Sequence, residues 1–274
     1  MHGWQRAFPF WLTLCCIWIA GNAALAQTPP EPYRPSEGQP GKDVVWIPTP
    51  EAMVGKMLDM AKVTTKDYVI DLGSGDGRNV IAAAKLGARA LGVEYNPDMV
   101  TLSQKLAKEA GVADKAQFVQ GDMYEADISK ATVMALFLLP VNLNKLQPKF
   151  LNLAPGSRIV ANTFGIDGWE PDFRTSLPQG SECESWCDIL LWIVPAKAAG
   201  TWNMSNGGRL VLTQENQMVQ GTATINGEPL TLSRGRMNGD EITFVAGTQT
   251  FTGKVKGNRI EGKLGTATVS ATKQ

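Results

Sequence analysis

Histidine is almost absent from this chain: His2 is the only one among 274 residues. It lies in an N-terminal segment that we expect to be removed, which would leave a chain with no imidazole. Ser-His and Cys-His nucleophilic pairs need an imidazole, and so do histidine metal sites, so these chemistries are excluded. We therefore predict no metal site, and any proton transfer must use a carboxylate or water.

Net charge is also absent, because Lys and Arg together number 26 and so do Asp and Glu. No global field would attract a nucleic acid or an anionic membrane surface. The apolar share of 43% and the charged share of 19% are those of a globular protein. The composition thus argues against a polyanion-binding role, and it leaves the oligomeric state open.

The N-terminal residues have the layout of a secretory signal peptide. Arg6 precedes an apolar run over residues 8–20, and Ala24-Leu25-Ala26 matches a small-x-small cleavage site. We predict a signal peptide over residues 1–26, export to the periplasm or the medium, and no stable membrane insertion after cleavage. The alternative is an uncleaved N-terminal membrane anchor, although the run is short for a bilayer span.

Cysteine is scarce as well. Cleavage would remove Cys15 and Cys16 and leave Cys183 and Cys187, and two cysteines in an exported protein suggest a disulfide. Because these two are four residues apart, an extended strand would hold their Cα atoms too far apart for a bond. A disulfide therefore requires a turn or helix there. Two unpaired, half-buried thiols are the alternative.

Strand-like and helix-like segments alternate along the first two thirds of the chain. Residues 27–43 are predicted to be a proline-rich, extended linker, and residues 44–199 an α/β domain. The predicted strands are 67–71, 88–93, 116–119, 131–138, 158–163 and 188–194, and the predicted helices begin at Thr49-Pro50, Arg78, Asn96-Pro97 and Pro140. Apolar strands alternating with helices predict a mostly parallel, Rossmann-like sheet with helices on both faces.

The pattern changes at Gly200, where short alternating segments separated by glycines begin. This spacing predicts a small antiparallel β meander or barrel over residues 200–274. Asn226-Gly227 and Asn238-Gly239 are typical hairpin turns. Gly200-Thr201-Trp202 resembles the opening strand of small calycin-type barrels. Such a domain would bind a ligand, recognise a protein substrate or brace the rest of the chain.

The stretch from Val69 to Gly77 predicts a ligand site. It combines a buried strand, a glycine turn and the start of a helix, with Asp71 two residues before the first glycine. Glycines let the backbone approach a ligand closely, and a helix N-terminus favours an anionic group. The spacing differs from that of a dinucleotide fingerprint, and the Gly-Lys-Ser/Thr ending of a P-loop is missing.

At these residues the chain resembles the class I S-adenosylmethionine-dependent methyltransferases, because the stretch matches their acid-x-Gly-x-Gly-x-Gly motif. The resemblance implies S-adenosylmethionine as the cofactor, with the glycine turn around its methionine part and Asp71 facing its ammonium group. It implies that Glu94 accepts from the ribose hydroxyls and Asp122 from the adenine amine. The cofactor-binding residues predicted in this way are Asp71, Gly73, Ser74, Gly75, Gly77, Glu94 and Asp122. Thr49 joins them on weaker grounds, since capping the first helix would explain it.

A narrower resemblance concerns the protein-lysine methyltransferases that modify the ATP synthase c-subunit and the adenine nucleotide translocase, together with their bacterial relatives. It covers residues 46–196 and rests on these segments: Trp46–Pro50, Asp71–Arg78, Gly92–Glu94, Leu138–Pro140 and Asn142. It implies methyl transfer to an amine, most simply a protein lysine. Backbone carbonyls near Pro140 would hold the amine, and Asn142 would add a side-chain acceptor. These two are the predicted catalytic residues.

Export and this cofactor conflict, because S-adenosylmethionine is made in the cytoplasm. The alternative function is therefore an exported protein that uses the methyltransferase fold for binding or as a scaffold, without turnover.

Overall fold

The computed structural model describes residues 1–4, 33–178, 180 and 183–274. The chain divides into two units, Met1–Pro32 and Tyr33–Gln274. Apart from its first four residues, the predicted signal peptide lies outside the described residues. Within the described part, no helix is both long and apolar enough to span a membrane.

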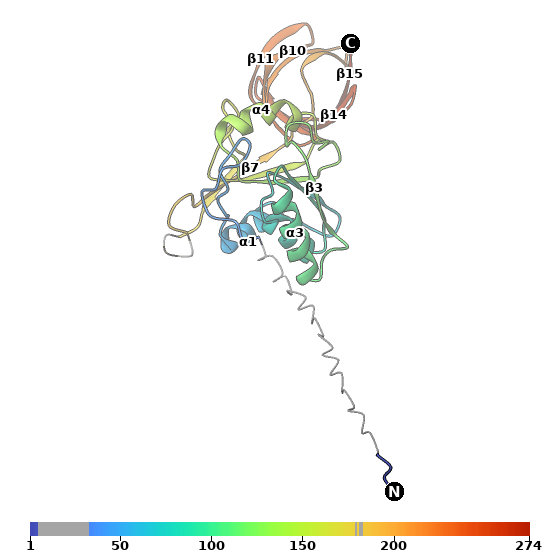
Figure 1. Ribbon diagram of the computed structural model, residues 1–274. Helices are drawn as coiled ribbons and strands as arrows, with labels where there is room; N and C mark the ends of the chain where they lie inside the picture. The colour runs from blue at the N-terminus through green and yellow to red at the C-terminus, as the bar shows by residue number, and fades with distance from the viewer. Residues whose placement is uncertain (5–32, 179, 181–182) are drawn as a thin grey trace. The chain divides into compact units, whose positions relative to one another are not determined.

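A seven-stranded sheet forms the centre of the α/β part, with the strand order β3-β2-β1-β4-β5-β7-β6 (Figure 1). The strands are β1 (Tyr68–Leu72), β2 (Arg89–Glu94), β3 (Ala116–Gln120), β4 (Val133–Leu136), β5 (Arg158–Asn162), β6 (Phe173–Ser176) and β7 (Asp188–Ile193). Strands β1 to β5 are parallel to one another, whereas β7 is antiparallel to both β5 and β6. The predicted mostly parallel, Rossmann-like sheet is confirmed.

In the part of the chain that the structure describes, four helices cover the two faces of this sheet. They are α1 (Glu51–Met60), α2 (Arg78–Lys85), α3 (Pro97–Glu109) and α4 (Pro140–Phe150). Buried side chains of α1, α2 and α3 share one core with Val69 and Val133. Those of α4 share a second core with Ile70 and Met134, which point to the opposite face of the same strands. The apolar runs in the sequence thus reflect strands that are buried on both sides.

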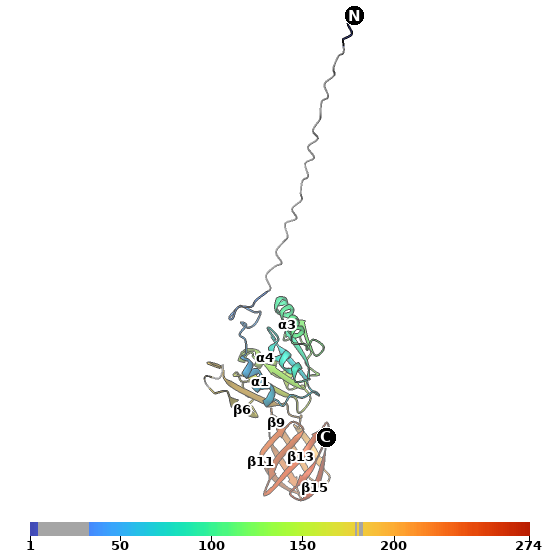
Figure 2. The same cartoon turned by 90° about the horizontal axis from the view of Figure 1, so that it is seen from below.

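Eight further strands close into an antiparallel barrel (Figure 2). They are β8 (Gly200–Met204), β9 (Arg209–Glu215), β10 (Met218–Ile225), β11 (Glu228–Asn238), β12 (Glu241–Ala246), β13 (Gln249–Lys256), β14 (Arg259–Leu264) and β15 (Ala267–Lys273). Alternate residues point inward and pack a core around Trp202, Phe244 and Phe251. The barrel interior is therefore filled by side chains, and the predicted meander is confirmed as closed.

Side chains of the barrel satisfy backbone groups in the α/β part. Gln217 Nε2 donates to the Glu170 carbonyl over 2.7 Å, and Asn216 Nδ2 donates to the Gly168 carbonyl over 2.7 Å. Arg236 forms an ion pair with Asp172 at 2.6 Å. These bonds favour bracing among the three roles considered for the barrel. Its boundary as a separate domain at residue 200 remains a prediction.

The two remaining cysteines form a disulfide, Cys183–Cys187, with their Cα atoms 5.8 Å apart. The turn that this bond requires is present, because Trp186 between them has a positive φ of 61°. Of the two alternatives in the sequence, the structure has the disulfide.

Several local predictions were wrong. The cap of α1 is Pro50 rather than Thr49, and no side chain caps that end. Strand β6, which has no alternating pattern, was missed. Asn238 lies in β11 and pairs with Glu241, so the turn begins one residue later than predicted. The described part of the linker is not simply extended, because Gly38 N donates to the Trp46 carbonyl and Pro40 bridges to Val45.

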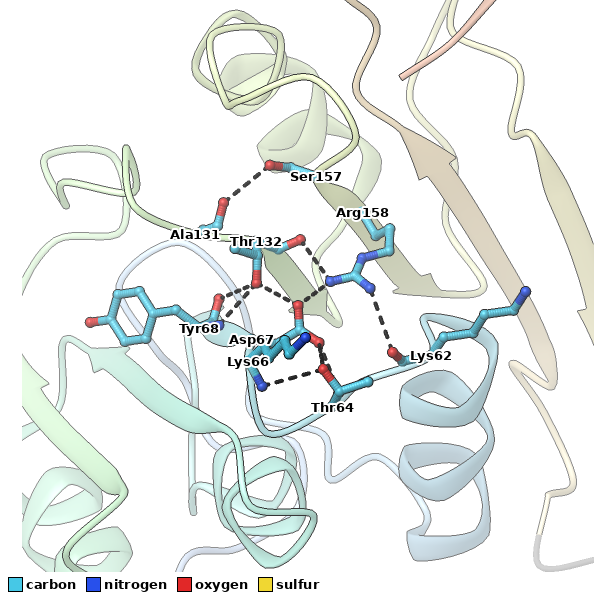
Figure 3. Close-up of polar contacts among 9 residues, drawn as sticks. All are labelled: Lys62, Thr64, Lys66, Asp67, Tyr68, Ala131, Thr132, Ser157 and Arg158. Carbon is cyan, nitrogen blue, oxygen red and sulfur yellow. Dashed lines mark hydrogen bonds and ion pairs between the residues drawn. The ribbon is translucent and has the colours of Figure 1, made fainter. Parts of the chain in front are cut away.

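The amino ends of β1, β4 and β5 are joined by a polar network centred on Asp67 (Figure 3). One carboxylate oxygen of Asp67 accepts from Thr132 Oγ1 at 2.7 Å and pairs with Arg158. The other accepts from the Thr64 amide and hydroxyl at 2.8 and 3.0 Å. Burial raises the pKa of Asp67, but the hydrogen bonds and the Arg158 charge outweigh it, so the pKa is lowered.

Candidate cofactor-binding site

The glycine turn after β1 is held against the neighbouring strand β2. The amides of Gly73 and Ser74 both donate to the Val93 carbonyl, over 2.8 and 3.2 Å, and the Gly77 amide donates to the Ser74 carbonyl over 2.9 Å. The three glycines, Gly73, Gly75 and Gly77, have φ values of 71, 54 and 84°. Other residues avoid this left-handed region, so the sequence pattern fixes the path of the turn.

Each glycine serves a different purpose in the packing. A Cβ on Gly77 would lie 2.5 Å from the Phe118 ring, so this glycine allows α2 to pack against β3. A Cβ on Gly75 would lie 2.6 Å from Trp46 Nε1. A Cβ on Gly73 would meet one atom within 4 Å, Leu138 Cδ2 at 3.4 Å. Gly73 therefore keeps open space at the carboxyl end of the sheet.

Among the acids of this site, Asp71 has the pKa that departs most from its ordinary value. Its side chain points to the same face as α2 and is 3% exposed, and one oxygen accepts from Asn79 Nδ2 at 3.1 Å. Burial raises the pKa of this carboxyl well above its ordinary value of 3.8, and the charges of Glu94 and Asp76 add to the rise. A carboxylate held in this way gains most from a cation placed beside it.

Glu94, the last residue of β2, connects the turn to the next helix. Its Oε2 accepts from the Gly75 amide and its Oε1 accepts from the Asn96 amide, both over 2.9 Å. An ionised carboxylate has about four acceptor positions, so two remain. They can accept from the two hydroxyls of a ribose, as the resemblance implies.

Asp122 follows β3 and faces the same pocket. Its carboxylate accepts from the Tyr124 amide at 2.8 Å and forms an ion pair with Lys42. The Lys42 hydrogen bond lowers the pKa of Asp122, and the same contact raises the pKa of Lys42. In this structure, a lysine from the segment before α1 thus takes the position that the resemblance gives to the adenine amine.

Arg78 at the start of α2 ties the turn to the segment before α1. Its guanidinium pairs with Asp76 at 2.6 Å and donates to the Thr49 carbonyl over 2.5 Å. Thr49 is 4% exposed and lines the pocket. A role as a helix cap would not account for this position.

One pocket brings together seven of the eight predicted cofactor residues. It is lined by Thr49, Asp71, Gly73, Ser74, Gly75, Glu94 and Asp122, and also by residues 39–48, Asp76, Arg78, Asn79, Val93, Tyr95, Asn96, Met99, Gly121, Met123 and Phe137. Ser74 Oγ is buried and has no hydrogen-bond partner among the described residues, so it is available to a ligand. The eighth residue, Gly77, does not line the pocket.

The two predicted catalytic residues also lie outside the pocket lining. Pro140 is the exposed first residue of α4. Asn142 is 2% exposed and donates from Nδ2 to the Tyr124 hydroxyl over 2.8 Å. Its carboxamide oxygen has no partner among the described residues. Their roles remain predictions.

The pocket also contains residues from segments that the sequence does not mark as part of a site, among them Lys42, Trp46 and Phe137. In the sequence, Lys42 lies in the predicted linker, Trp46 carries only a resemblance, and Phe137 lies inside a predicted strand. Lys42 and Trp46 reach the pocket because residues 38–46 fold back on themselves. No periodicity in the sequence signals such a return.

The strand order, the glycine turn and the acids at the ends of β1 and β2 and just after β3 define a class I S-adenosylmethionine-dependent methyltransferase. The cofactor fits the pocket because its ammonium and ribose would meet the buried Asp71 and the free acceptor positions of Glu94. A model of the ANTKMT methyltransferase domain matches residues 71–173.

Known proteins agree with this class. The chain is 45% identical over 132 residues to a protein-lysine N-methyltransferase of Saccharolobus islandicus (strain REY15A), covering 47% of this chain and 81% of that protein. It is 39% identical over 131 residues to the mouse lysine N-methyltransferase of the ATP synthase c-subunit, covering 47% of this chain and 53% of that protein. The chain thus spans about half the length of this mouse relative.

Among solved structures, a Salinibacter ruber protein described as an RNA methyltransferase, in complex with S-adenosyl-L-homocysteine, is 45% identical with a TM-score of 0.51. The likeness covers 55% of this chain and 95% of that one. The chain belongs to the family of protein-lysine N-methyltransferases that includes the archaeal and mouse proteins, and its cofactor is S-adenosylmethionine.

Proposed function

We propose that this protein is an exported N-methyltransferase that transfers the methyl group of S-adenosylmethionine to the side-chain amine of a protein lysine. The observation that carries the proposal is the convergence of Asp71, Glu94 and Asp122 on one pocket at the carboxyl ends of three adjacent strands. In open α/β sheets this edge is where ligands bind. The names of the relatives support lysine as the acceptor.

The chain's own residues would contribute mainly by positioning. Methyl transfer is an in-line displacement: the amine nitrogen forms a bond to the methyl carbon, the carbon–sulfur bond breaks, and its electron pair stays on sulfur. The sulfonium supplies this leaving group when the cofactor is bound. A lysine ammonium has a pKa near ~10.4, so it must first lose a proton to water or a carboxylate. Holding the two reactants in line can supply most of the acceleration.

The acceptor can be tested with the purified mature chain and S-adenosylmethionine labelled in its methyl group. Separate reactions would contain bacterial envelope proteins and total RNA. We expect label in protein that hydrolysis recovers as methyl-lysine, and none in RNA. Label in RNA alone would overturn the lysine proposal and would agree with the description of the Salinibacter structure. No label in either, with the cofactor bound, would favour a binding protein without turnover.

Export is part of the same proposal. The predicted signal peptide supports it, and so does the Cys183–Cys187 disulfide, because disulfides persist in oxidising compartments. Cell fractionation with mass spectrometry of the N-terminus tests it, and we expect a chain that begins at Gln27 in the periplasm or medium. An intact N-terminus in the membrane fraction would favour the anchored alternative. An intact chain in the cytoplasm would contradict export.

A further inference from the structure

Three aromatic rings from separate segments meet beside the cofactor pocket. Phe137 follows β4 and lines the pocket, Phe164 follows β5, and Trp186 lies in the loop before β7. The Phe137 ring centroid is 6.1 Å from that of Phe164, with the planes 13° apart, and 6.1 Å from that of Trp186, with the planes 59° apart. We call Phe137, Phe164 and Trp186 the aromatic rim.

The aromatic rim is not simply hydrophobic core. Phe137 and Phe164 are half-buried, and 42% of Trp186 is exposed. By contrast, three tryptophans in the α/β part and the barrel are buried: Trp169 at 1%, Trp192 at 0% and Trp202 at 0%. An exposed indole beside a pocket leaves ring surface free for a ligand, which core packing does not require.

The backbone at Trp186 is held in a conformation that a bulky residue normally avoids. Its φ is 61°, in the left-handed region, and such positions persist where the surroundings impose them. Here the disulfide closes the loop around it: Cys183 is 1% exposed and packs in the core with α1 and α2, and Cys187 follows Trp186 directly. The bond therefore fixes the indole against Phe137.

The buried carboxamide of Asn162 lies on the same side of the sheet as the Phe137 ring. Leu136 and Ala161 are paired in the register of β4 and β5. The next residues are Phe137, just after β4, and Asn162, the last residue of β5, so both lie at the same edge of the sheet. By the alternation of β4 and β5, both side chains point to the face that carries Asp71. Asn162 is 1% exposed, and its carboxamide oxygen has no partner among the described residues.

Resting on the function proposed above, we propose that Trp186, fixed by the Cys183–Cys187 disulfide against Phe137 and Phe164, determines specificity by binding the acceptor's alkylammonium side chain. The ring faces attract the ammonium group through cation–π interactions, and their apolar surface covers its methylene stem. The Asn162 oxygen accepts a hydrogen bond from the amine. Because the disulfide positions the indole, reduction of the disulfide weakens binding of the acceptor and leaves cofactor binding unchanged.

The experiment measures binding rather than turnover, so that it is independent of the unidentified protein substrate. The probes are Nα-acetyl-lysine methylamide and its uncharged counterpart Nα-acetyl-norleucine methylamide, titrated into the full mature chain with S-adenosylhomocysteine bound. We expect the lysine probe to bind more tightly than the norleucine probe. Trp186→Ala should weaken the lysine probe about tenfold, and Trp186→Phe should restore most of the affinity.

A double variant, Cys183→Ser with Cys187→Ser, should weaken the lysine probe as much as Trp186→Ala does. Phe173→Ala is the matched control, because Phe173 is 55% exposed on β6 and is not one of the three rings of the aromatic rim. It should leave both probes unchanged. Every variant must unfold cooperatively in urea as the wild type does, which shows that it is folded.

An unchanged affinity for the lysine probe in Trp186→Ala would overturn the proposal, and so would equal binding of the two probes. A parallel loss of S-adenosylhomocysteine affinity would assign Trp186 to the cofactor site instead. Lysine-probe binding that depends on Trp186, in a protein that methylates no protein, would uphold the aromatic rim and contradict the proposed function.

Discussion

Asp67 and Asp71 lie four residues apart in the sequence, just before β1 and near its carboxyl end. Their surroundings shift the pKa values of the two carboxyls in opposite directions. Asp67 accepts from Thr64 and Thr132 and pairs with Arg158, which together lower the pKa of its carboxyl despite burial. Among the described residues, Asn79 is the one side-chain donor to Asp71, and burial raises the pKa of this carboxyl. Asp67 therefore has hydrogen-bond partners and a counter-charge, whereas Asp71 has no counter-charge in the part of the chain that the structure describes.

This difference separates a structural acid from a functional one. A carboxylate with all its partners inside the protein stabilises the fold, and it offers nothing to a ligand. A buried carboxylate without a counter-charge costs folding free energy, which a bound cation can offset. The comparison therefore predicts opposite effects of mutation at the two ends of β1.

The largest effect on stability is expected from Asp67→Ala. It leaves Arg158, Thr132 and Thr64 without their common acceptor, and breaking such a buried pair costs about 3 kcal/mol of unfolding free energy. Urea denaturation would measure it. Asp59→Ala, which removes an exposed partner of Lys56, should cost less than about 0.5 kcal/mol. Equal losses in the two variants would contradict the structural role of Asp67.

Asp71→Asn should weaken ligand binding and increase the stability of the ligand-free protein. Loss of the charge opposite the cofactor's ammonium should weaken S-adenosylhomocysteine binding by about 10- to 100-fold, the scale of a hydrogen bond to a charged group. The ligand-free variant should be more stable than the wild type at neutral pH, because a buried charge is gone. Calorimetric titration and urea denaturation of the same sample test both halves. A variant that is less stable and binds normally would make Asp71 another structural acid.

The two acids also predict opposite responses to pH. The lowered pKa of Asp67 means that its contribution is present above the ordinary value of 3.8 and is lost as pH falls through the native value. The raised pKa of Asp71 means that the native state holds the proton more tightly, so stability falls as pH rises from 3.8 through the native value.

Unfolding free energies of the wild type and Asp71→Asn, measured from pH 3 upward, would separate these contributions. We expect the advantage of the variant to grow with pH and then level off. An advantage that is constant across the range would mean that Asp71 does not titrate in this window.

The smallest effect is expected at Lys42. Because its ammonium pairs with Asp122 at the predicted adenine position, Lys42→Met should tighten S-adenosylhomocysteine binding by no more than about fivefold, the scale of an exposed ion pair. Lys56→Met, which also removes an exposed lysine, is the matched control and should change nothing. Weaker binding in Lys42→Met would show that this lysine contacts the bound cofactor.

Much of the α/β part could be predicted from the sequence because local signals agree with the fold. Apolar runs mark strands buried on both faces, Asn96 caps α3 through its side chain, and the glycines at 73, 75 and 77 have positive φ values. The cofactor acids follow from the same logic, since they lie at or just beyond the ends of strands. The barrel could be predicted for a similar reason, because inward-pointing residues alternate along its strands and glycines mark its turns.

The rest depends on contacts between distant segments. Strand β6 is mostly exposed at the edge of the sheet and has no pattern to detect. The Lys42–Asp122 pair joins residues 80 positions apart, and nothing local distinguishes it from a surface lysine. Trp186 has its role because a disulfide and the rings of Phe137 and Phe164 surround it. Such convergence is a property of the packed chain rather than of any stretch of it.

The central claim is that the carboxyl end of the sheet binds S-adenosylmethionine. Isothermal titration of the purified mature chain with S-adenosylmethionine tests it most directly, with Asp71→Asn as the paired sample. The account predicts saturable binding to one site per chain in the wild type and a strongly weakened titration in the variant. Absence of saturable binding in the folded wild type, or equal binding in both proteins, would contradict it.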